Sequence, residues 1–466
     1  MIFSSLTFLY YFLPVVLIIY FITPMPGGSN RLRNIVLLLS SLVFYAWAEP
    51  VFILIMVGQC ISSWGLALLI DKYRGQKLSK YIMILSISID LGVLALFKYA
   101  DFFLSNVNFF LGTDIGLLRL VLPIGISFYT FQILSYTVDL YRGKISVNRN
   151  LLDFATYVSM FPPLLAGPIV RYADIEKMLS ARKHRFEDFA VGVRRFAIGL
   201  GKKVLIADVM GQLIAVYRVS GESSVLFTWM YLVAFVLKLY FDFSGYSDMA
   251  IGLGRMFGFK FLENFNYPHI SKSMSEFWTR WHISLVTWFR DFVYIPLGGN
   301  RVSVPRSVLN LFIIWFLIGF WHGADWNFIA WGVYYFLILL FERFVLSKYL
   351  DKIPGLFRHL YVWFVLLSTG VFFDAASLAD IWATLGLMFG FGADSFAGLE
   401  SLYYLRSFLV PILIGFIGGT PIPKNLAKKI FARVKILEPV AVALILIIVT
   451  AFLVTGSFNP FVYFRF

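Results

Sequence analysis

Long apolar segments alternate with short polar segments along the whole chain. The apolar segments cover residues 6–23, 35–48, 51–70, 81–100, 117–138, 151–170, 189–217, 225–248, 307–322, 326–345, 359–375, 378–393, 402–419 and 438–456. An α-helix crosses the hydrocarbon core of a bilayer with about 20 apolar residues, and some of these segments are too short or too polar to cross alone. The pattern predicts an all-α polytopic membrane protein with about 11–13 transmembrane helices and additional re-entrant or interfacial helices.

The composition supports this fold class and excludes several others. Of the 466 residues, 60% are hydrophobic and 14% are charged, and the mean hydropathy is +0.80. A soluble domain is typically about 45–50% apolar and about 25% charged. A membrane β-barrel would instead show short segments of alternating hydrophobicity. The single cysteine, Cys60, cannot form an intramolecular disulfide, and the five histidines form no HxxxH or HExxH pair, so no metal site is predicted.

The net charge of +14 comes mainly from basic loops. Lys and Arg gather in the stretches 31–33, 72–80, 142–149, 177–203, 348–358 and 424–435. The positive-inside rule places such loops in the cytoplasm, so they predict an orientation rather than a nucleic-acid partner. Both termini are then expected outside, with residues 457–466 as a short exported tail. The first 30 residues carry no charge, which predicts a retained transmembrane helix over 6–23 rather than a cleaved signal peptide.

One longer and more polar stretch, residues 250–306, departs from this pattern. It contains two of the five histidines together with several Trp, Arg and Asn residues. On the predicted orientation it enters from the cytoplasmic side, as an interfacial or re-entrant insertion. Long connections inside compact folds are often functional, so we expect this stretch to supply part of the active site.

His322 ends the apolar run 311–321. An ionisable group there is unfavourable unless it faces protein or water, and such groups often mark functional sites. Gly319 and Gly323 flank it and would allow close approach of a backbone or a ligand. Its position alone leaves two interpretations open: a functional imidazole, or a helix end at the membrane interface beside Asp325.

Other polar groups within apolar surroundings also allow two interpretations. His282 lies among tryptophans that suit either an active site or a simple interfacial anchor. Lys238 and Asp242 are four residues apart on one predicted helix, so we expect them to neutralise each other. Ser127 and Gln132 either line a polar tunnel or pack between helices. The sequence has no G-x-S-x-G, P-loop or dinucleotide-binding motif.

Several motifs spread over nearly the whole chain carry a family resemblance. They are the stretches 3–5 (FSS), 166–172 (AGPIVRY), 240–250 (YFDFSGYSDMA), 277–284 (FWTRWHIS), 294–300 (YIPLGGN) and 319–323 (GFWHG). These motifs resemble those of the membrane-bound O-acyltransferases. The similarity is greatest to the bacterial branch that contains membrane subunits of alginate and peptidoglycan O-acetylation.

The resemblance implies a single domain over residues 1–466, with transmembrane helices around a central funnel or tunnel. It implies that His322 is the principal catalytic residue and that His282 has a supporting role. It carries no catalytic role onto Asp325. Further residues are expected to line the tunnel or the substrate site: Trp278, Arg280, Trp281, Ser284, Arg290, Asn300, Trp321, Asp242, Ser127 and Gln132.

The tail, residues 461–466 (FVYFRF), resembles the F-x-Y-x-x-F ending found in the related teichoic acid D-alanylation machinery. That resemblance implies that Tyr463 carries the acyl group as an ester on the outer side of the membrane. The alternative is an aromatic anchor at the membrane interface.

Together these observations predict an acyltransferase of the bacterial inner membrane. We expect it to move an acetyl group from a cytoplasmic donor, acetyl-CoA, outward for O-acetylation of a cell-surface polysaccharide. His322 would act as a base or a transient acyl acceptor. Besides the donor and membrane lipids, an exported O-acetyltransferase of the SGNH type or related envelope machinery is the expected partner. No bound cofactor is expected.

Two alternatives remain. The first is D-alanyl transfer to teichoic acid, which uses the same chemistry. The second is a transporter or lipid flippase, which is less favoured because no internal repeat is visible.

Overall fold

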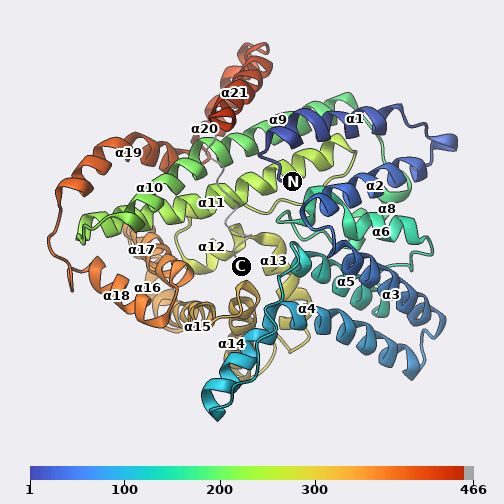
Figure 1. The fold of residues 1–466 in the computed structure, drawn as a ribbon, viewed down its shortest axis with the longest axis horizontal. Coiled ribbons are helices and arrows are strands. Elements are labelled where there is room, and N and C mark those ends of the chain that lie inside the picture. The colour runs from blue at the N-terminus through green and yellow to red at the C-terminus, as the bar shows by residue number, and fades with distance from the viewer. Residues whose placement is uncertain (456–466) are drawn as a thin grey trace. The chain divides into compact units, whose positions relative to one another are not determined.

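The computed structural model describes residues 1–455 and is helical through most of that range (Figure 1). In the first half the helices are α1 (Leu13–Ile22), α2 (Arg31–Ala48), α3 (Ile53–Lys72), α4 (Lys77–Leu111), α5 (Ile126–Tyr141), α6 (Leu151–Ser159), α7 (Phe161–Leu164), α8 (Tyr172–Ser180), α9 (Phe186–Gly201), η3 (Lys202–Ala207), α10 (Asp208–Val219) and α11 (Val225–Met256). A short π-helix, η1 (Phe8–Phe12), precedes α1, and a short 3-10 helix, η2 (Pro26–Gly28), lies between α1 and α2.

The second half begins with short elements and continues with long helices. They are η4 (Pro268–Ile270), α12 (Met274–Arg280), α13 (Ile283–Phe289), η5 (Arg290–Tyr294), α14 (Val304–His322), α15 (Trp326–Phe341), η6 (Glu342–Leu346), α16 (Ser347–Leu350), α17 (Gly355–Asp374), α18 (Leu378–Met388), α19 (Leu399–Gly418), α20 (Ile422–Arg433) and α21 (Leu437–Val454). Within residues 1–455 the one β-type pairing is an isolated bridge between Ser224 and Ser395.

Nine helical segments of the described chain are long and apolar enough to cross a membrane. They are α2, α3, α4, α11, α14, the continuous segment Trp326–Leu350, α17, α19 and α21. Two shorter apolar segments, Phe8–Ile22 and Leu378–Met388, add to these. The predicted all-α polytopic membrane fold is confirmed. The expected 11–13 crossings and the orientation of the termini stay predictions, and Tyr463 lies outside the described residues.

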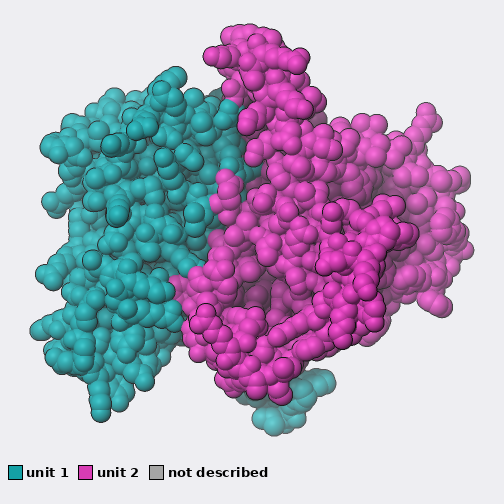
Figure 2. All heavy atoms as spheres, turned by 180° about the vertical axis from the view of Figure 1, so that it is seen from behind, with its two compact units in different colours: residues 1–196, 247–262 teal, residues 197–246, 263–466 magenta. Residues whose placement is uncertain are grey.

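The chain forms two compact units (Figure 2). Unit 1 contains residues 1–196 and 247–262, and unit 2 contains residues 197–246 and 263–466. The division falls inside α9 and α11. The single domain implied by the family resemblance is not tested by this division and stays a prediction.

Unit 1 is built around aromatic rings and one buried guanidinium group. Phe3, Phe8 and Phe44 pack with ring centroids 4.8–5.9 Å apart. The buried Arg182 donates hydrogen bonds to the Tyr20 hydroxyl (2.9 Å) and the Asn34 side-chain oxygen (2.6 Å). Because hydrogen bonds offset the cost of burying a charge, these contacts fix the packing of α1, α2 and the segment after α8.

Unit 2 contains the predicted catalytic histidine. Here α14 packs against α15, α15 packs against α17, and α19 packs against α10. The stretch 263–303 between α11 and α14 forms only short helices and turns, and the interfacial or re-entrant insertion expected over 250–306 stays a prediction. The described part of unit 2 therefore holds both the long helices and the irregular stretch from which an active site can be built.

Candidate active site

His322 is the last residue of α14, at the turn into α15. Three glycines let these helices approach closely. A Cβ on Gly319 would lie 2.5 Å from the Phe328 carbonyl oxygen, and one on Gly332 would lie 2.4 Å from the Trp315 carbonyl oxygen. Gly323 is equally confined, since its Cβ would lie 2.1 Å from the Phe328 ring. The close approach expected at Gly319 and Gly323 is therefore confirmed, and it fixes the end of α14.

The imidazole of His322 is surrounded by aromatic rings and is 5% exposed. Its ring centroid lies 4.9 Å from that of Trp321, 4.9 Å from that of Trp331 and 5.3 Å from that of Phe373. Edge contacts of this kind hold a ring in one orientation. The turn at His322 is thus buried in protein, and its position relative to the membrane interface stays a prediction.

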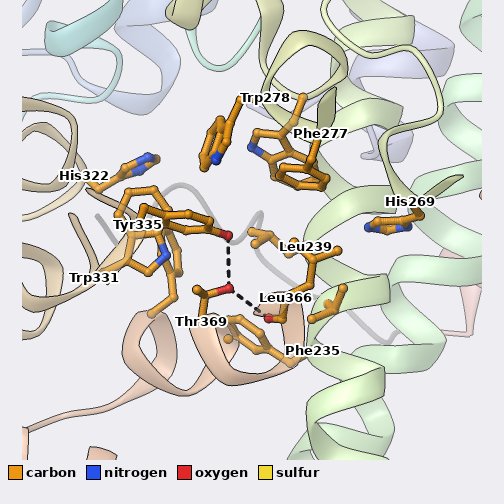
Figure 3. Close-up of a pocket in the computed structure, with 14 residues that line it drawn as sticks. Phe235, Leu239, His269, Phe277, Trp278, His322, Trp331, Tyr335, Leu366 and Thr369 are labelled. Carbon is orange, nitrogen blue, oxygen red and sulfur yellow. Dashed lines mark hydrogen bonds between the residues drawn. The ribbon is translucent and has the colours of Figure 1, made fainter. Parts of the chain in front are cut away.

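His322 lines an apolar cavity of about 40 Å³ inside unit 2 (Figure 3). This volume can hold a few water molecules or a small acyl group. Helices α11, α12, α15 and α17 supply most of the wall, with the following lining residues: Phe235, Val236, Leu239, His269, Phe277, Trp278, Trp281, His322, Trp331, Tyr335, Leu366, Thr369, Gly370 and Phe373. No Asp, Glu, Lys or Arg of the described chain is among them.

One face of α17 extends along this cavity. Leu366, Thr369, Gly370 and Phe373 are spaced at i, i+3, i+4 and i+7, which places them on the same side of a helix. The hydroxyl groups on this wall are already paired: Tyr335 and Thr369 lie 3.0 Å apart, and Thr369 donates to the Leu366 carbonyl oxygen (2.9 Å; Figure 3). They are therefore structural groups rather than free donors.

A second and more polar cavity, of about 640 Å³, shares Trp278 with the first. Its wall includes Asn300, Arg343 and Arg358. The Glu342 carboxylate accepts hydrogen bonds from the backbone N–H groups of Met274 (2.7 Å) and Ser275 (2.9 Å), at the start of α12. An acid at a helix N-terminus satisfies otherwise unpaired N–H groups, so this contact fixes the helix that carries Trp278.

His282, the second predicted catalytic residue, is completely buried and does not line the cavity of His322. Its Nδ1 donates to the side-chain oxygen of Asn264 (3.2 Å), which also accepts from the Ser284 N–H and hydroxyl. The ring of Trp321 contacts both imidazoles, with centroids 6.1 Å from His282 and 4.9 Å from His322. This arrangement suits a supporting role in which His282 holds the ring of Trp321 in place beside His322.

The other predicted residues separate into three groups. Trp278 and Trp281 line the His322 cavity, Trp321 contacts His322, and Asn300 lines the polar cavity. Three residues instead make local polar contacts elsewhere in unit 2: Arg280 pairs with Glu276, Arg290 pairs with the adjacent Asp291, and Ser284 donates to Asn264.

The remaining three residues lie away from the cavity wall. The Asp242 carboxylate is 2.9 Å from the Lys203 ammonium, which also pairs with Asp208 (2.7 Å). Asp242 is therefore part of a buried charge cluster whose other members come from η3 and α10. The pairing expected from local spacing named Lys238 alone as the partner of Asp242, and the structure adds Lys203. Ser127 and Gln132 are buried in α5 of unit 1.

Most of the residues that line this cavity were not predicted from the sequence, and His269 is the histidine among them. It belongs to the stretch 250–306 that was expected to supply part of the active site. The polar character of that stretch was the available signal, but a histidine without a recognisable motif could not be placed from sequence. Burial lowers the pKa of His269 and of His282 to about 3, so both rings are neutral at physiological pH.

A polytopic helical fold with a buried histidine in an aromatic cavity is consistent with a membrane acyltransferase, and comparisons with known proteins agree. The model of the membrane-bound O-acyltransferase family matches residues 144–375. The chain is 41% identical to the probable alginate O-acetylase AlgI of Pseudomonas aeruginosa, over 84% of this chain and 75% of that protein.

Two further relatives have different acceptors in their names. The peptidoglycan O-acetyltransferase of Helicobacter pylori is 33% identical over 86% of this chain and 82% of its own length. The teichoic acid D-alanyltransferase of Bacillus subtilis is 30% identical over 48% of this chain and 60% of its own length. The chain belongs to the membrane-bound O-acyltransferase family, and it is a multi-pass membrane acyltransferase.

Proposed function

We propose that this protein transfers acetyl groups across the bacterial inner membrane for O-acetylation of a cell-surface polysaccharide, with His322 as the catalytic residue. The observation that carries the proposal is the position of His322, which is buried on the wall of an aromatic cavity to which residues 1–455 contribute no Asp, Glu, Lys or Arg. Such a wall excludes water and so protects an activated acyl group from hydrolysis. The polysaccharide O-acetylating relatives support this acceptor class.

The reaction is an acyl transfer from a thioester, with acetyl-CoA as the proposed donor. The acceptor hydroxyl oxygen attacks the carbonyl carbon, so that a C–O bond forms and the C–S bond breaks. His322 takes the proton from the hydroxyl and returns it to the departing thiolate, which leaves as a free thiol. An imidazole suits this role because it exchanges protons near neutral pH.

The lining of the cavity favours acetyl over D-alanyl transfer. A D-alanyl group carries an ammonium, and burying an isolated charge without a partner is unfavourable by several kcal/mol. Cation–π contacts with the aromatic rings would stabilise the buried ammonium by about 2 kcal/mol, which is less than the free-energy cost of its burial. An acetyl group is neutral and fits a free volume of about 40 Å³.

The decisive test compares wild-type protein with His322→Ala in membranes that contain equal amounts of each. Labelled acetyl-CoA and a D-alanyl carrier protein are supplied in parallel, and ester-linked label on hydroxyl acceptors is measured. We expect acetyl transfer by the wild type and a loss of at least about 100-fold in the variant, the scale of a general base. Full activity of His322→Ala would refute the catalytic assignment, and exclusive D-alanyl transfer would refute the donor.

Tyr463 is proposed as the exported acyl carrier, on the basis of the tail motif alone. The phenol oxygen would accept the acetyl group as an ester, and an exported SGNH-type acetyltransferase would then move that group to the polysaccharide. Intact-mass measurement after incubation with labelled donor should show one acetyl group on the wild type and none on Tyr463→Phe. A Tyr463→Phe variant that retains full polysaccharide acetylation in cells would exclude this relay.

A further inference from the structure

His269 lies at the opposite end of the cavity from His322 (Figure 3). It belongs to the short turn η4 and is 6% exposed. Its ring packs against Tyr240 (centroids 4.6 Å apart) and Trp363 (4.9 Å). The residue is thus built into the wall of the cavity.

Neither ring nitrogen of His269 has a hydrogen-bond partner within residues 1–455. A buried polar group that lacks its hydrogen bond destabilises a protein, so native structures rarely retain one without a reason. The Tyr335 and Thr369 hydroxyls on the same wall do have partners. The unpaired imidazole therefore indicates a position where a ligand completes the hydrogen bonding.

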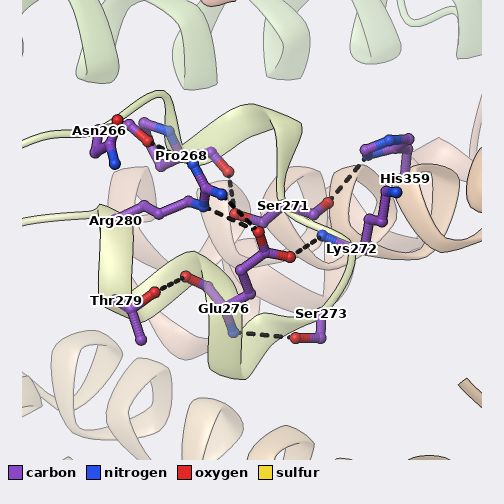
Figure 4. Close-up of polar contacts among 9 residues, drawn as sticks. All are labelled: Asn266, Pro268, Ser271, Lys272, Ser273, Glu276, Thr279, Arg280 and His359. Atoms are coloured by element: carbon purple, nitrogen blue, oxygen red, sulfur yellow. Dashed lines mark hydrogen bonds and ion pairs between the residues drawn. The ribbon is translucent and has the colours of Figure 1, made fainter. Parts of the chain in front are cut away.

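The backbone around His269 is held firmly in place. Tyr267 has a φ of 47°, a left-handed conformation that is unfavourable for a tyrosine and persists only when its surroundings enforce it. The Ser271 hydroxyl donates to the Pro268 carbonyl oxygen (2.6 Å), and the Ser271 carbonyl oxygen lies 3.1 Å from His359 Nδ1 (Figure 4). Glu276 accepts from the Lys272 N–H (2.8 Å). The turn is therefore fixed from both α12 and α17.

The two histidines are separated along α17. Trp363 contacts His269 and Phe373 contacts His322, and these ten positions correspond to about 15 Å of helix. The His269 end adjoins the start of α17, where Arg358 contacts the Lys272 carbonyl oxygen. On the orientation that the basic loops predict, this end faces the cytoplasm. A donor that enters from the cytoplasm would therefore reach His269 before its acyl group reaches His322.

We propose that His269 is a binding subsite for a secondary amide in the thiol-bearing arm of the acyl donor. A neutral imidazole offers one N–H donor, which suits an amide carbonyl, and one nitrogen acceptor, which suits an amide N–H. The arm of coenzyme A contains two secondary amides between its thiol and its phosphates. The proposal rests on the thioester donor proposed above and adds a specific contact that holds the arm while the acyl group reaches His322.

The test compares three acetyl thioesters with different numbers of amides: acetyl-CoA with two, S-acetyl-N-acetylcysteamine with one, and S-acetyl-ethanethiol with none. For each donor, kcat and KM are measured in wild type, His269→Phe and His269→Gln. Phe keeps the ring packing and removes both nitrogens, whereas Gln keeps a donor and an acceptor. We expect KM for acetyl-CoA to rise roughly 10- to 100-fold in His269→Phe, with partial recovery in His269→Gln and little change for S-acetyl-ethanethiol.

The ratio of kcat/KM between an amide-containing and an amide-free donor is independent of how much of a variant folds. His184→Phe is the matched control, because His184 is hydrogen bonded to Tyr20 (2.7 Å) within unit 1 and has a structural role. Its ratio should equal that of the wild type. An unchanged ratio in His269→Phe would overturn the inference alone, whether activity is intact or falls equally for all donors. A wild type that transfers from no acetyl thioester would overturn the proposed function, and this inference with it.

Discussion

The close packing of α14 against α15 makes Gly319→Ala a sharp test of the active-site geometry. A Cβ at position 319 would lie 2.5 Å from the Phe328 carbonyl oxygen and 3.1 Å from the Gly332 Cα. Both neighbours are backbone atoms, so the clash cannot be relieved by rotating a side chain. Ordinary contact begins at 3.4 Å, so the helices must separate locally by about 0.9 Å.

This separation has two expected consequences. Overpacking a well-packed core destabilises a protein by about 1–3 kcal/mol. His322 is three residues further along α14, so the same shift moves its imidazole relative to the walls supplied by Trp331 and Phe373. A displacement of about 1 Å in a catalytic group lowers a rate by roughly 100-fold, because the reacting atoms are no longer aligned. We therefore expect a larger loss in kcat than in the amount of folded protein.

The assay measures acetyl transfer per folded protein in detergent, with thermal unfolding followed on the same samples. Gly92→Ala in α4 is the matched control, because nothing lies within 4 Å of a Cβ at that position. It should retain wild-type activity and gain up to about 1 kcal/mol from the higher helix propensity of alanine. Wild-type kcat in Gly319→Ala would show that the helices yield without moving the catalytic group, and the reasoning would be wrong.

Two further predictions concern the buried charges and histidines of unit 2. Lys203→Met leaves the Asp208 and Asp242 carboxylates buried without their ammonium, so the free energy of unfolding should fall by about 3–5 kcal/mol. Arg290→Met, at the exposed pair with Asp291, is the control and should change the free energy of unfolding by less than about 1 kcal/mol. Equal effects of the two variants would contradict the assignment of Lys203 to a buried charge cluster. Burial lowers the pKa of His282 and His269 to about 3, below the value near 6.5 of an unfolded chain, so the stability that each neutral ring contributes is complete above pH 6.5 and is lost as the pH falls toward 3. The unfolding temperature should therefore decline below pH 6.5, and His269→Phe should weaken that decline; an unchanged pH dependence would argue that the buried rings do not titrate on unfolding.

Much of the fold followed from the hydrophobic pattern. The segments 225–248 and 307–322 became α11 and α14 because a segment of about 20 apolar residues can satisfy its backbone in a bilayer only as a helix. The close approach at Gly319 was also expected, since a residue without a side chain leaves room for a neighbouring backbone. Sequence is sufficient for such features because helix formation depends on neighbours within a few positions, and a glycine on an apolar helix leaves room for whichever backbone packs against it.

The residues that make up the candidate site were harder to predict from the sequence than the helices were. Family resemblance and the cost of an imidazole in an apolar run identified His322, and the tertiary structure added its aromatic surroundings. His282 was paired with His322 on motif grounds, but it lies against Asn264 and Ser284, outside the cavity. His269 lies 53 positions from His322 in the sequence and had no motif. Whether two such residues line one cavity depends on how α12, α15 and α17 pack, and no local pattern encodes that packing.

The sequence by itself determined that this protein is a polytopic helical membrane acyltransferase, and it predicted that the histidine after the apolar run 311–321 is the reactive group. Those properties arise from burial energies that each residue carries with it. Only the tertiary structure decided which polar groups are satisfied. It gave Asp242 a partner in Lys203, placed His282 against Trp321, and left the nitrogens of His269, a lining residue of the cavity, without a hydrogen-bond partner in the described chain. Hydrogen bonds and ion pairs are directional and short, so they depend on atoms that only the packed helices bring together.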